Sequence, residues 1–305
     1  MLKRLLIIVA ILVTNCQQNE PAAPVAPVAP IKQVTKKADQ ITQDLQTPES
    51  VLYDADQDVY FISNINGNPT AVDDNGYISR VNAETLQGDM KWIDGAKQDV
   101  TLNAPKGMAI IGDTLYVCDL TVVRKFDRKT GAAIGEVAIP GSTFMNDAAS
   151  DGKSVYVSDS GLKAGAGGNF EPTGTDAVWQ ITADKPKQIA KGKDLKAPNG
   201  LEVADGRVWV VTFGANELYQ IDNGKKANVT TLPKGSLDGL VRLADGSFLV
   251  SSWDAKAVYR GKPGGAFAAV IENVNSPADI GYDTKRNRVL IPHFMDNIVT
   301  VHPLK

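Results

Sequence analysis

The chain has 305 residues, of which 43% are hydrophobic, and a formal net charge of −3 at pH 7. This length and apolar content are enough for one substantial core, so we expect a single globular domain. The near-balance of charge excludes the strongly basic surface that nucleic-acid binding requires, and a total of two cysteines excludes a disulfide framework.

The first 16 residues have the features of an export signal. Lys3 and Arg4 precede an unbroken apolar run over residues 5–13, which has the length of a signal-peptide core and is short for a membrane-spanning helix. The run leads into "LVTNC", which resembles the cleavage site of a bacterial lipoprotein, with Cys16 as the lipidated first residue. Asn15 departs from the small residue usually found before that cysteine, so ordinary secretory cleavage is the alternative.

A proline- and alanine-rich tether follows over residues 17–35. It contains "PAAPVAPVAP", which cannot bury enough apolar surface to fold and favours an extended spacer. We therefore expect an exported lipoprotein, anchored through Cys16 to a membrane of the bacterial cell envelope and facing the periplasm or the cell surface. The folded domain would comprise residues 36–305. The other cysteine, Cys118, lies in an apolar segment and is expected to be a buried, inert thiol.

Six short apolar segments recur along residues 36–305. They read "DVYFISN", "TLYVCDL", "SVYVSDS", "RVWVVTF", "SFLVSSW" and "RVLIPHF" and begin at Asp58, Thr114, Ser154, Arg207, Ser247 and Arg288. Their starts are separated by 56, 40, 53, 40 and 41 residues, and periods near 40 with several strands per unit are typical of propeller blades. The repeats predict an all-β, six-bladed β-propeller. The apolar segments are expected to be the inner strands, covered on both faces by neighbouring blades.

Each apolar segment is followed by another strand and, in five repeats, by a weaker third one. The sixth repeat lacks the third strand, whereas "KKADQITQDLQTPES", from Lys36, resembles the end of a repeat. We predict that this N-terminal strand completes the last blade and closes the ring. The two longer periods place insertions from Asn64 and from Gly161, which should border the axial site. The second insertion is glycine-rich and suits either a mobile lid or a plain surface loop.

A short cap precedes each apolar segment. The caps read "PES", "PKG", "MND", "PNG", "LDG" and "PAD", with Glu49, Lys106, Asn146, Asn199, Asp238 and Ala278 in the middle. A circular arrangement of the repeats would place all six middle residues around one axis. Four of them carry oxygen ligands, without His or Cys beside them. Such a set suits a hard divalent cation, Ca²⁺ first, with Mg²⁺ or Mn²⁺ as alternatives. The other interpretation is that Asn and Asp only shape the turn at each cap.

The caps resemble those of the gluconolactonase and regucalcin (senescence marker protein) family of six-bladed propellers, whose architecture diisopropyl fluorophosphatase and the paraoxonases share. The resemblance covers residues 36–305 and is carried by "PES", "MND", "PNG" and "LDG". It implies a metal site formed by Glu49, Asn146, Asn199 and Asp238, with Asp238 also as catalytic base or nucleophile. The implied activity is metal-dependent hydrolysis of a small-molecule ester or lactone at the top of the propeller channel, where the cation would polarise the carbonyl.

Two positions depart from the family pattern. Sugar-lactone members have an arginine where this chain has Phe144, so we expect a less polar ester or lactone and take Phe144 as a substrate-binding candidate. Lys106 stands where the paraoxonases have a histidine. It could bind an anionic substrate, act as a catalytic acid or base, or replace the metal by pairing with Glu49 or Asp238.

The ends of the six apolar segments form a second set of candidates. They are Ser63, Asp119, Asp159, Thr212, Ser252 and His293. This ring could form a polar pocket wall or only satisfy turn amides. His293 and Trp253 are candidates for substrate binding, and Phe213 and Phe294 could reach the pocket rim, whereas Trp209 is expected in the core.

Three functions remain open. The leading one is a monomeric, lipid-anchored, metal-dependent lactonase or esterase that binds no nucleic acid. The alternative is a non-catalytic propeller that binds a ligand or partner protein through its top face, since propellers host both kinds of function. In the third, calcium only stiffens the ring. The sequence contains no Gly-x-Ser-x-Gly elbow, phosphate-binding loop or CxxC motif.

Overall fold

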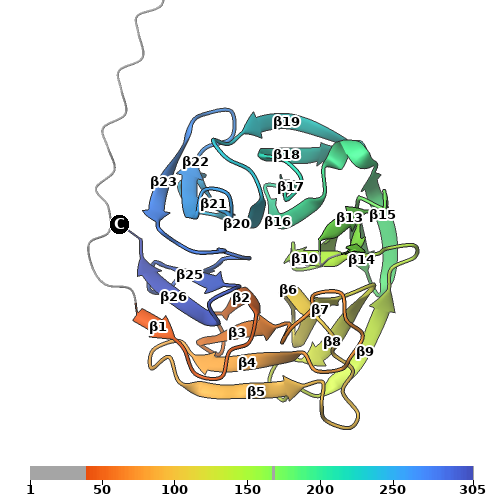
Figure 1. Ribbon diagram of the computed structural model, residues 1–305, viewed down its shortest axis with the longest axis vertical. Helices are drawn as coiled ribbons and strands as arrows, with labels where there is room; N and C mark the ends of the chain where they lie inside the picture. The colour runs from red at the N-terminus through yellow and green to blue at the C-terminus, as the bar shows by residue number, and fades with distance from the viewer. Residues whose placement is uncertain (1–38, 167–168, 305) are drawn as a thin grey trace, which may run out of the picture. The chain divides into compact units, whose positions relative to one another are not determined.

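The structure is a computed structural model that describes residues 39–166 and 169–304. Strands dominate, and these two ranges contain no α-helix. Six four-stranded antiparallel sheets are arranged around one axis as the blades of a β-propeller, which confirms the predicted fold (Figure 1). The signal peptide, Cys16 and the tether lie outside the described residues. Within those residues, no helix has the length and apolar character needed to span a bilayer.

The strands of each blade follow one another from the axis outward. Blades 1 to 3 consist of β2 (Pro48–Asp54), β3 (Val59–Asn64), β4 (Tyr77–Asn82) and β5 (Gly88–Asp94); β6 (Pro105–Ile111), β7 (Thr114–Asp119), β8 (Val122–Asp127) and β9 (Ala133–Ala138); and β10 (Met145–Ser150), β11 (Val155–Asp159), β14 (Ala177–Thr182) and β15 (Lys185–Lys191). Blades 4 and 5 consist of β16 (Pro198–Ala204), β17 (Arg207–Thr212), β18 (Glu217–Asp222) and β19 (Lys225–Thr231); and β20 (Leu237–Arg242), β21 (Phe248–Ser252), β22 (Ala257–Gly261) and β23 (Phe267–Glu272). A 3₁₀ turn, η2 (Lys193–Leu195), joins β15 to β16.

The sixth blade combines the two ends of the described chain. Its inner strands are β24 (Gly281–Asp283), β25 (Arg288–His293) and β26 (Ile298–Pro303), and its outermost strand is β1 (Asp39–Ile41). β1 pairs antiparallel with β26, with Ile41 opposite Val299. This pairing confirms the predicted closure of the ring by an N-terminal strand.

The innermost strands differ from the prediction. The apolar segments expected at the inner edge, such as β3 and β17, are the second strands of their blades, and the innermost strands of blades 1 to 5 begin at the caps. The prediction was wrong because the innermost strands carry polar residues toward the channel, as β20 does with Asp238 and Arg242, which weakens their apolar pattern. The second strands are mostly buried, as expected, and every residue of β3 is buried.

Apolar side chains fill the spaces between neighbouring blades and supply most of the favourable free energy of folding. Between blades 4 and 5, for example, Val211 and Leu218 pack with Leu240 and Val250, and all four are buried. At the far end of the blades from the caps, Asp-Gly turns join the innermost strands to the second strands in blades 3 to 5. Gly246, with φ of 79°, occupies the left-handed position that glycine favours.

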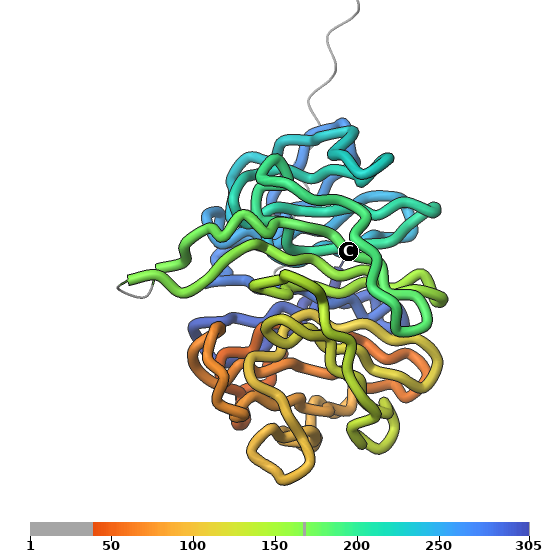
Figure 2. Tube along the Cα trace, turned by 90° about the vertical axis from the view of Figure 1, so that its right-hand side faces the viewer, coloured from red at the N-terminus to blue at the C-terminus, as the bar shows by residue number. Residues whose placement is uncertain are grey.

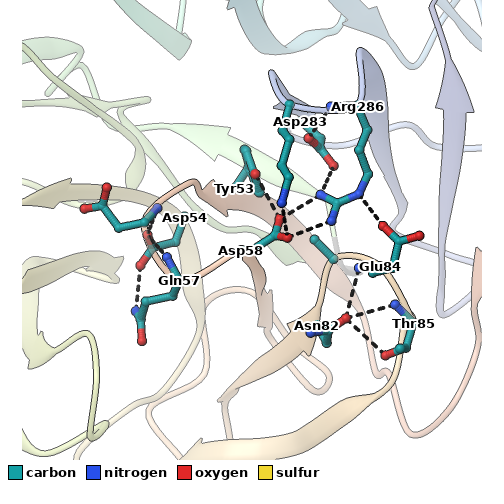
Figure 3. A network of polar contacts seen from close by, with 12 residues as sticks. Tyr53, Asp54, Gln57, Asp58, Asn82, Glu84, Thr85, Asp283 and Arg286 are labelled. Atoms are coloured by element: carbon teal, nitrogen blue, oxygen red, sulfur yellow. Dashed lines mark hydrogen bonds and ion pairs between the residues drawn. The ribbon is translucent and has the colours of Figure 1, made fainter.

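A network of charged side chains joins blade 6 to blade 1 at the end opposite the caps (Figure 3). Arg286, in the β24–β25 turn, donates to Asp58 at 2.7 Å, to Glu84 at 2.8 Å and to Asp283 at 3.1 Å. Arg288 donates to the same Asp283 carboxylate at 3.1 Å. We call these residues the closure seam, because they connect the first and last blades of the ring.

Candidate active site

The polar caps converge on one pocket at the start of the innermost strands. The pocket has a volume of 270 Å³. Its polar residues are Glu49, Lys106, Asn146, Asn199 and Asp238, and its apolar residues are Ile65, Pro69, Phe144, Leu162, Phe170, Phe213, Trp253 and Phe294. The structure therefore brings together five of the six cap residues named from the sequence. The sixth, Ala278, is fully buried and adds no polar group.

An irregularity in strand pairing aims each of these residues at the axis. In blade 1 the register shifts between Pro48 and Ser50, so that Glu49 is the extra residue of a β-bulge. The register shifts at the same place in blades 2 to 5, beside Lys106, Asn146, Asn199 and Asp238. The cap motif is thus a recurring bulge at the start of an innermost strand, and not a loop before the blade.

Serines on the second strands support these bulges. The hydroxyl of Ser63 accepts a hydrogen bond from the backbone N–H of Ser50, at 2.9 Å. Ser158 and Ser251 accept corresponding bonds from the N–H groups of Asp147 and Gly239. Sequence reasoning missed Ser158 and Ser251, although a serine recurs near the end of three apolar segments.

The third residues of the caps form a lower ring below the pocket floor. They are Ser50, Gly107, Asp147, Gly200, Gly239 and Asp279. At Gly107, a Cβ atom would lie 2.1 Å from Oδ1 of Asp147, so the close approach of neighbouring blades requires glycine there. Asp147 accepts hydrogen bonds from the N–H groups of Ala148 and Leu201, both at 2.6 Å, and links blade 3 to blade 4. Asp279 accepts one from the Ser50 hydroxyl and links blade 6 to blade 1.

The two carboxyl groups of the pocket lack the partners that buried carboxylates normally have. Oδ2 of Asp238 accepts a hydrogen bond from Nε1 of Trp253 at 2.7 Å, but its Oδ1 and Oε2 of Glu49 are buried without a partner. They are the two carboxylate oxygens in that condition among the described residues. Burial, with the charge of Asp279, raises the pKa of Asp238 to about 8. Burial and the charges of Asp238 and Asp279 also raise the pKa of Glu49 well above its ordinary value.

The two carboxamides are held by their nitrogen atoms. Nδ2 of Asn146 donates to the Ser160 hydroxyl at 3.0 Å, and Nδ2 of Asn199 donates to the Leu237 carbonyl at 3.3 Å. Ser160 in turn donates to the Pro198 carbonyl at 2.7 Å, which fixes the first of these amides. With the nitrogens engaged, the amide oxygens remain as the atoms that can bind a ligand.

Lys106 contributes a buried ammonium group with few partners. Nζ donates to the Ala104 carbonyl at 2.9 Å and lies 4.5 Å from the centre of the Phe144 ring. In the described structure it forms no ion pair within 4.0 Å, so it does not neutralise Glu49 or Asp238 by direct contact. Burial lowers the pKa of Lys106, and the charges of Glu49 and Asp119 oppose that change.

Aromatic rings form the wall of the pocket. The ring of Trp253 lies 5.9 Å from Phe213 and 5.3 Å from Phe294, and Phe144 lies 5.4 Å from Phe170. Phe213 and Phe294 thus line the pocket as expected, whereas Trp209 packs in the core at 5.0 Å from Phe248.

Both insertions border the pocket, as their positions in the blades predicted. The first contributes Ile65 and Pro69. The second contains a short hairpin of β12 (Leu162–Ala164) and β13 (Phe170–Pro172), drawn in green as it extends beyond the blades in Figure 2, and contributes Leu162 and Phe170. The sequence offered no signal for these two side chains, because a glycine-rich insertion has no readable periodicity.

His293 lies outside the residues that line the pocket. Its Nε2 is 2.8 Å from the Thr300 hydroxyl, and its Nδ1 is 3.6 Å from Asp296. The other residues at the ends of the apolar segments mostly accept hydrogen bonds from turn amides. This agrees with the interpretation that they satisfy turn amides, and not with a polar pocket wall. Asp119, for instance, accepts from the N–H groups of Asn103 and Ala104. Cys118 is fully buried, and burial raises the pKa of its thiol well above the ordinary value.

A second cavity, of 380 Å³, lies at the opposite end of the axis. Its carboxyl groups all have donors, since Asp147 and Asp279 are bonded within the lower ring and Glu202 accepts from the backbone N–H of Arg242 at 3.1 Å. Of these two cavities, the pocket at the caps is the one that combines buried carboxylate oxygens that lack partners with a volume that suits a small ligand.

The donor set of the pocket fits a hard divalent cation. Two buried carboxylate oxygens without partners and two oriented amide oxygens form the all-oxygen set that Ca²⁺ accepts. In the described residues, no cluster of three or more His, Cys, Asp and Glu side chains is arranged to hold a metal. Any metal in this pocket therefore depends on the two asparagines as much as on the two acids.

Comparison with known proteins gives structural neighbours only. No family model and no curated protein matches the chain. A gluconolactonase from Xanthomonas campestris shares the fold with a TM-score of 0.67 and 16% identity, over 94% of this chain and 99% of that one. Virginiamycin B lyase from Staphylococcus aureus matches with a TM-score of 0.60 and 13% identity, over 88% and 99%. A chain of a nidogen–laminin complex matches with 0.56 and 14%, over 71% and 76%.

These neighbours confirm that the resemblance to the gluconolactonases extends to the architecture. At such low identities the likeness concerns the fold, and six-bladed propellers carry several kinds of function. The function therefore has to be argued from the pocket.

Proposed function

We propose that this protein is a metal-dependent hydrolase of the lactonase or esterase type, with its active site in the pocket at the caps. The observation that carries the proposal is the pair of buried carboxylate oxygens without partners, on Glu49 and Asp238. Proteins rarely retain such groups without a ligand, because an unpaired buried charge is costly. The gluconolactonase-like architecture supports the same choice.

Four residues would hold the cation, namely Glu49, Asn146, Asn199 and Asp238. When bound, the cation would polarise the carbonyl of an ester or lactone and stabilise the negative charge that develops on its oxygen. Ca²⁺ fits best, because it tolerates neutral amide oxygens and a large coordination shell, with Mg²⁺ or Mn²⁺ as alternatives.

Asp238 is the proposed base or nucleophile. Its Oδ2 accepts a hydrogen bond from Trp253, whereas Oδ1 has no partner and would contact the cation. As a base, the carboxylate takes a proton from water while the water oxygen bonds to the carbonyl carbon. The bond between that carbon and the alkoxy oxygen then breaks, and the alkoxy oxygen receives the proton. The walls of Phe144, Phe213 and Phe294 exclude bulk water and bind an apolar substrate.

The experiment is a hydrolysis assay of the full chain on phenyl acetate, dihydrocoumarin and glucono-δ-lactone, with calcium or with a chelator. We expect turnover of the two aromatic substrates in preference to the sugar lactone, loss of turnover in the chelator, and a loss of about 1,000-fold in the Asp238→Asn variant. Circular dichroism controls for folding. Full activity in a folded Asp238→Asn protein would remove Asp238 from the mechanism.

A second candidate function is partner binding through the same face. Val72 is 82% exposed and Met295 is 68% exposed, and both lie in loops that, like the caps, leave the blades at the pocket end. A folded protein that binds calcium but hydrolyses none of the substrates would favour this function, or a cation that only stiffens the ring.

We also propose that the chain is exported and anchored in the bacterial cell envelope through a lipid on Cys16, and that the propeller is monomeric. The motif "LVTNC" with the proline-rich stretch after it supports this proposal. Metabolic labelling with a palmitate analogue should mark the wild-type chain and not the Cys16→Ser variant. Labelling of both would contradict it.

A further inference from the structure

Lys106 is the feature of the pocket that hydrolysis does not require. Its side chain lines the pocket although the residue is only 1% exposed. Nζ has three donors, and the structure shows one acceptor, the Ala104 carbonyl. The Phe144 ring covers one side of the ammonium group. Donors of Nζ thus remain for a ligand inside the pocket.

The charges of the pocket floor specify what that ligand should be. Glu49 and Asp238 together can carry two negative charges, and Lys106 carries one positive charge. With a divalent cation on the four oxygen ligands, the side chains that line the pocket carry one positive charge more than negative. This step depends on the proposed function. The carboxyl groups of Asp279 and Asp147 lie below this lining and accept hydrogen bonds from Ser50 and Leu201. A surplus of one charge in a buried, largely apolar pocket favours a monoanion.

The apolar wall of the pocket limits the size and the polarity of the rest of the ligand. Five aromatic rings and three aliphatic or proline side chains leave 270 Å³, and that volume suits a single ring or a short branched chain. A phosphate monoester, with nearly two negative charges at neutral pH, would exceed the surplus. A carboxylate carries the one charge that Lys106 can pair with through a charge-assisted hydrogen bond.

We propose that the substrate is an ester or lactone carrying one carboxylate together with an aromatic or branched apolar group, and that Lys106 binds this carboxylate. The ester carbonyl would then face Asp238, while the apolar part contacts the wall around Trp253.

The test measures binding by calorimetry in calcium buffer with two probes of the same shape, benzoate and benzamide. The wild-type protein should bind benzoate at least tenfold more tightly. In the Lys106→Met variant, which keeps the length of the stem, the preference should fall below threefold. Lys106→Arg should retain a preference for benzoate, because it keeps the charge.

Three outcomes would overturn the proposal: no preference in the wild type, no binding of benzoate, or an undiminished preference in Lys106→Met, which would assign the carboxylate to the metal. The hydrolysis assay tests the proposed function independently of the carboxylate site. Selective binding of benzoate without any turnover would sink the proposed function and leave the carboxylate site standing. Turnover without selective binding of benzoate would sink the carboxylate site and leave the proposed function standing.

Discussion

Two buried aspartates, Asp238 in the pocket and Asp283 in the closure seam, show how differently this chain treats the same side chain. Asp283 accepts from the Tyr60 hydroxyl at 2.6 Å and from Arg286 and Arg288, both at 3.1 Å. Burial alone would raise the pKa of Asp283, but these hydrogen bonds outweigh it and the pKa is lowered. Asp238 accepts from Trp253 at 2.7 Å, and burial and Asp279 raise its pKa to about 8 although hydrogen bonds from Trp253 and Asn199 oppose that change.

The two aspartates differ in the number of cationic side chains within ion-pair distance. The seam places two arginines against one buried carboxylate, whereas the pocket places its single lysine beyond ion-pair distance of either acid. The seam is therefore complete without a ligand, and its purpose is to hold the ring closed. The pocket lacks such pairing, and its unpartnered carboxylate oxygens are the basis of the proposed cation site.

The same substitution at the two aspartates should separate these roles. Asp283→Asn leaves two arginines facing a neutral amide, and we expect it to lower the free energy of unfolding by about 2–3 kcal/mol. Asp238→Asn, in a chelator at pH 8, should lower it by less than about 0.5 kcal/mol or raise it, because it removes a charge without a partner. Urea unfolding followed by tryptophan fluorescence measures both. Equal losses would show that Asp238 is paired within the protein.

The pH dependence of the metal-free protein sharpens the contrast. A carboxyl group with a higher pKa in the folded than in the unfolded chain takes up a proton on folding. Its stabilising contribution is therefore present near pH 4 and is lost as the pH rises toward 8. Asp238 and Asp279, with pKa values of about 8 and about 7, and Glu49 all act in this direction.

In a chelator, the free energy of unfolding should thus fall by about 4 kcal/mol between pH 5 and pH 8, from Asp238 at about 1.4 kcal/mol per pH unit. The Asp238→Asn variant should lose less over the same range, because one of the three groups no longer titrates. Urea unfolding at four pH values measures the slope. A wild-type curve that is flat or rising with pH would contradict the raised pKa values.

The contact of Phe144 with Lys106 provides a test with a smaller expected change in the free energy of unfolding. Phe144→Leu removes the ring that lies 4.5 Å from Nζ of Lys106, and we expect it to lower the free energy of unfolding by about 1 kcal/mol. Phe213→Leu is the matched control, since it loses a contact with Trp253 and none with a cation. In thermal unfolding, a loss no greater for Phe144→Leu than for this control would show that the ring contributes packing alone.

Exposed ion pairs should show the smallest effect. Arg260 pairs with Asp245 at 3.0 Å, and the side chain of Asp245 is 50% exposed. We expect Arg260→Met to change the free energy of unfolding by less than about 0.5 kcal/mol, in contrast to Asp283→Asn. If Arg260→Met lowered the free energy of unfolding as much as Asp283→Asn, burial would add nothing to the strength of the ion pairs in the closure seam.

The repeats made the propeller and the ring of caps predictable. A register of six similar segments places equivalent residues at equivalent positions, so Glu49, Lys106, Asn146, Asn199 and Asp238 could be assigned to one axis without any structure. The identity of the innermost strands was not predictable in the same way, because the bulge beside each cap inserts one residue and interrupts the period of two on which strand recognition depends.

Contacts between segments that are distant in the chain could not be predicted from the sequence either. Arg286 and Asp58 are 228 positions apart, and only the closure of the ring brings them together. Asp147 and Asp279 are the third residues of their caps, and their bonds to neighbouring blades depend on the glycines between them. Leu162 and Phe170 reach the pocket through a hairpin that no periodic pattern marks.

The central claim is that the carboxylates of the pocket are unpaired because they bind a divalent cation. Calorimetric titration of Ca²⁺ into the chelator-treated protein tests it most directly, with the Glu49→Gln variant as a folded comparison. We predict saturable binding of one ion in the wild type and at least a tenfold weaker affinity in the variant. An absence of binding by the folded wild-type protein, with Mg²⁺ and Mn²⁺ equally inert, would contradict the account and leave Lys106 as the only cation of the pocket.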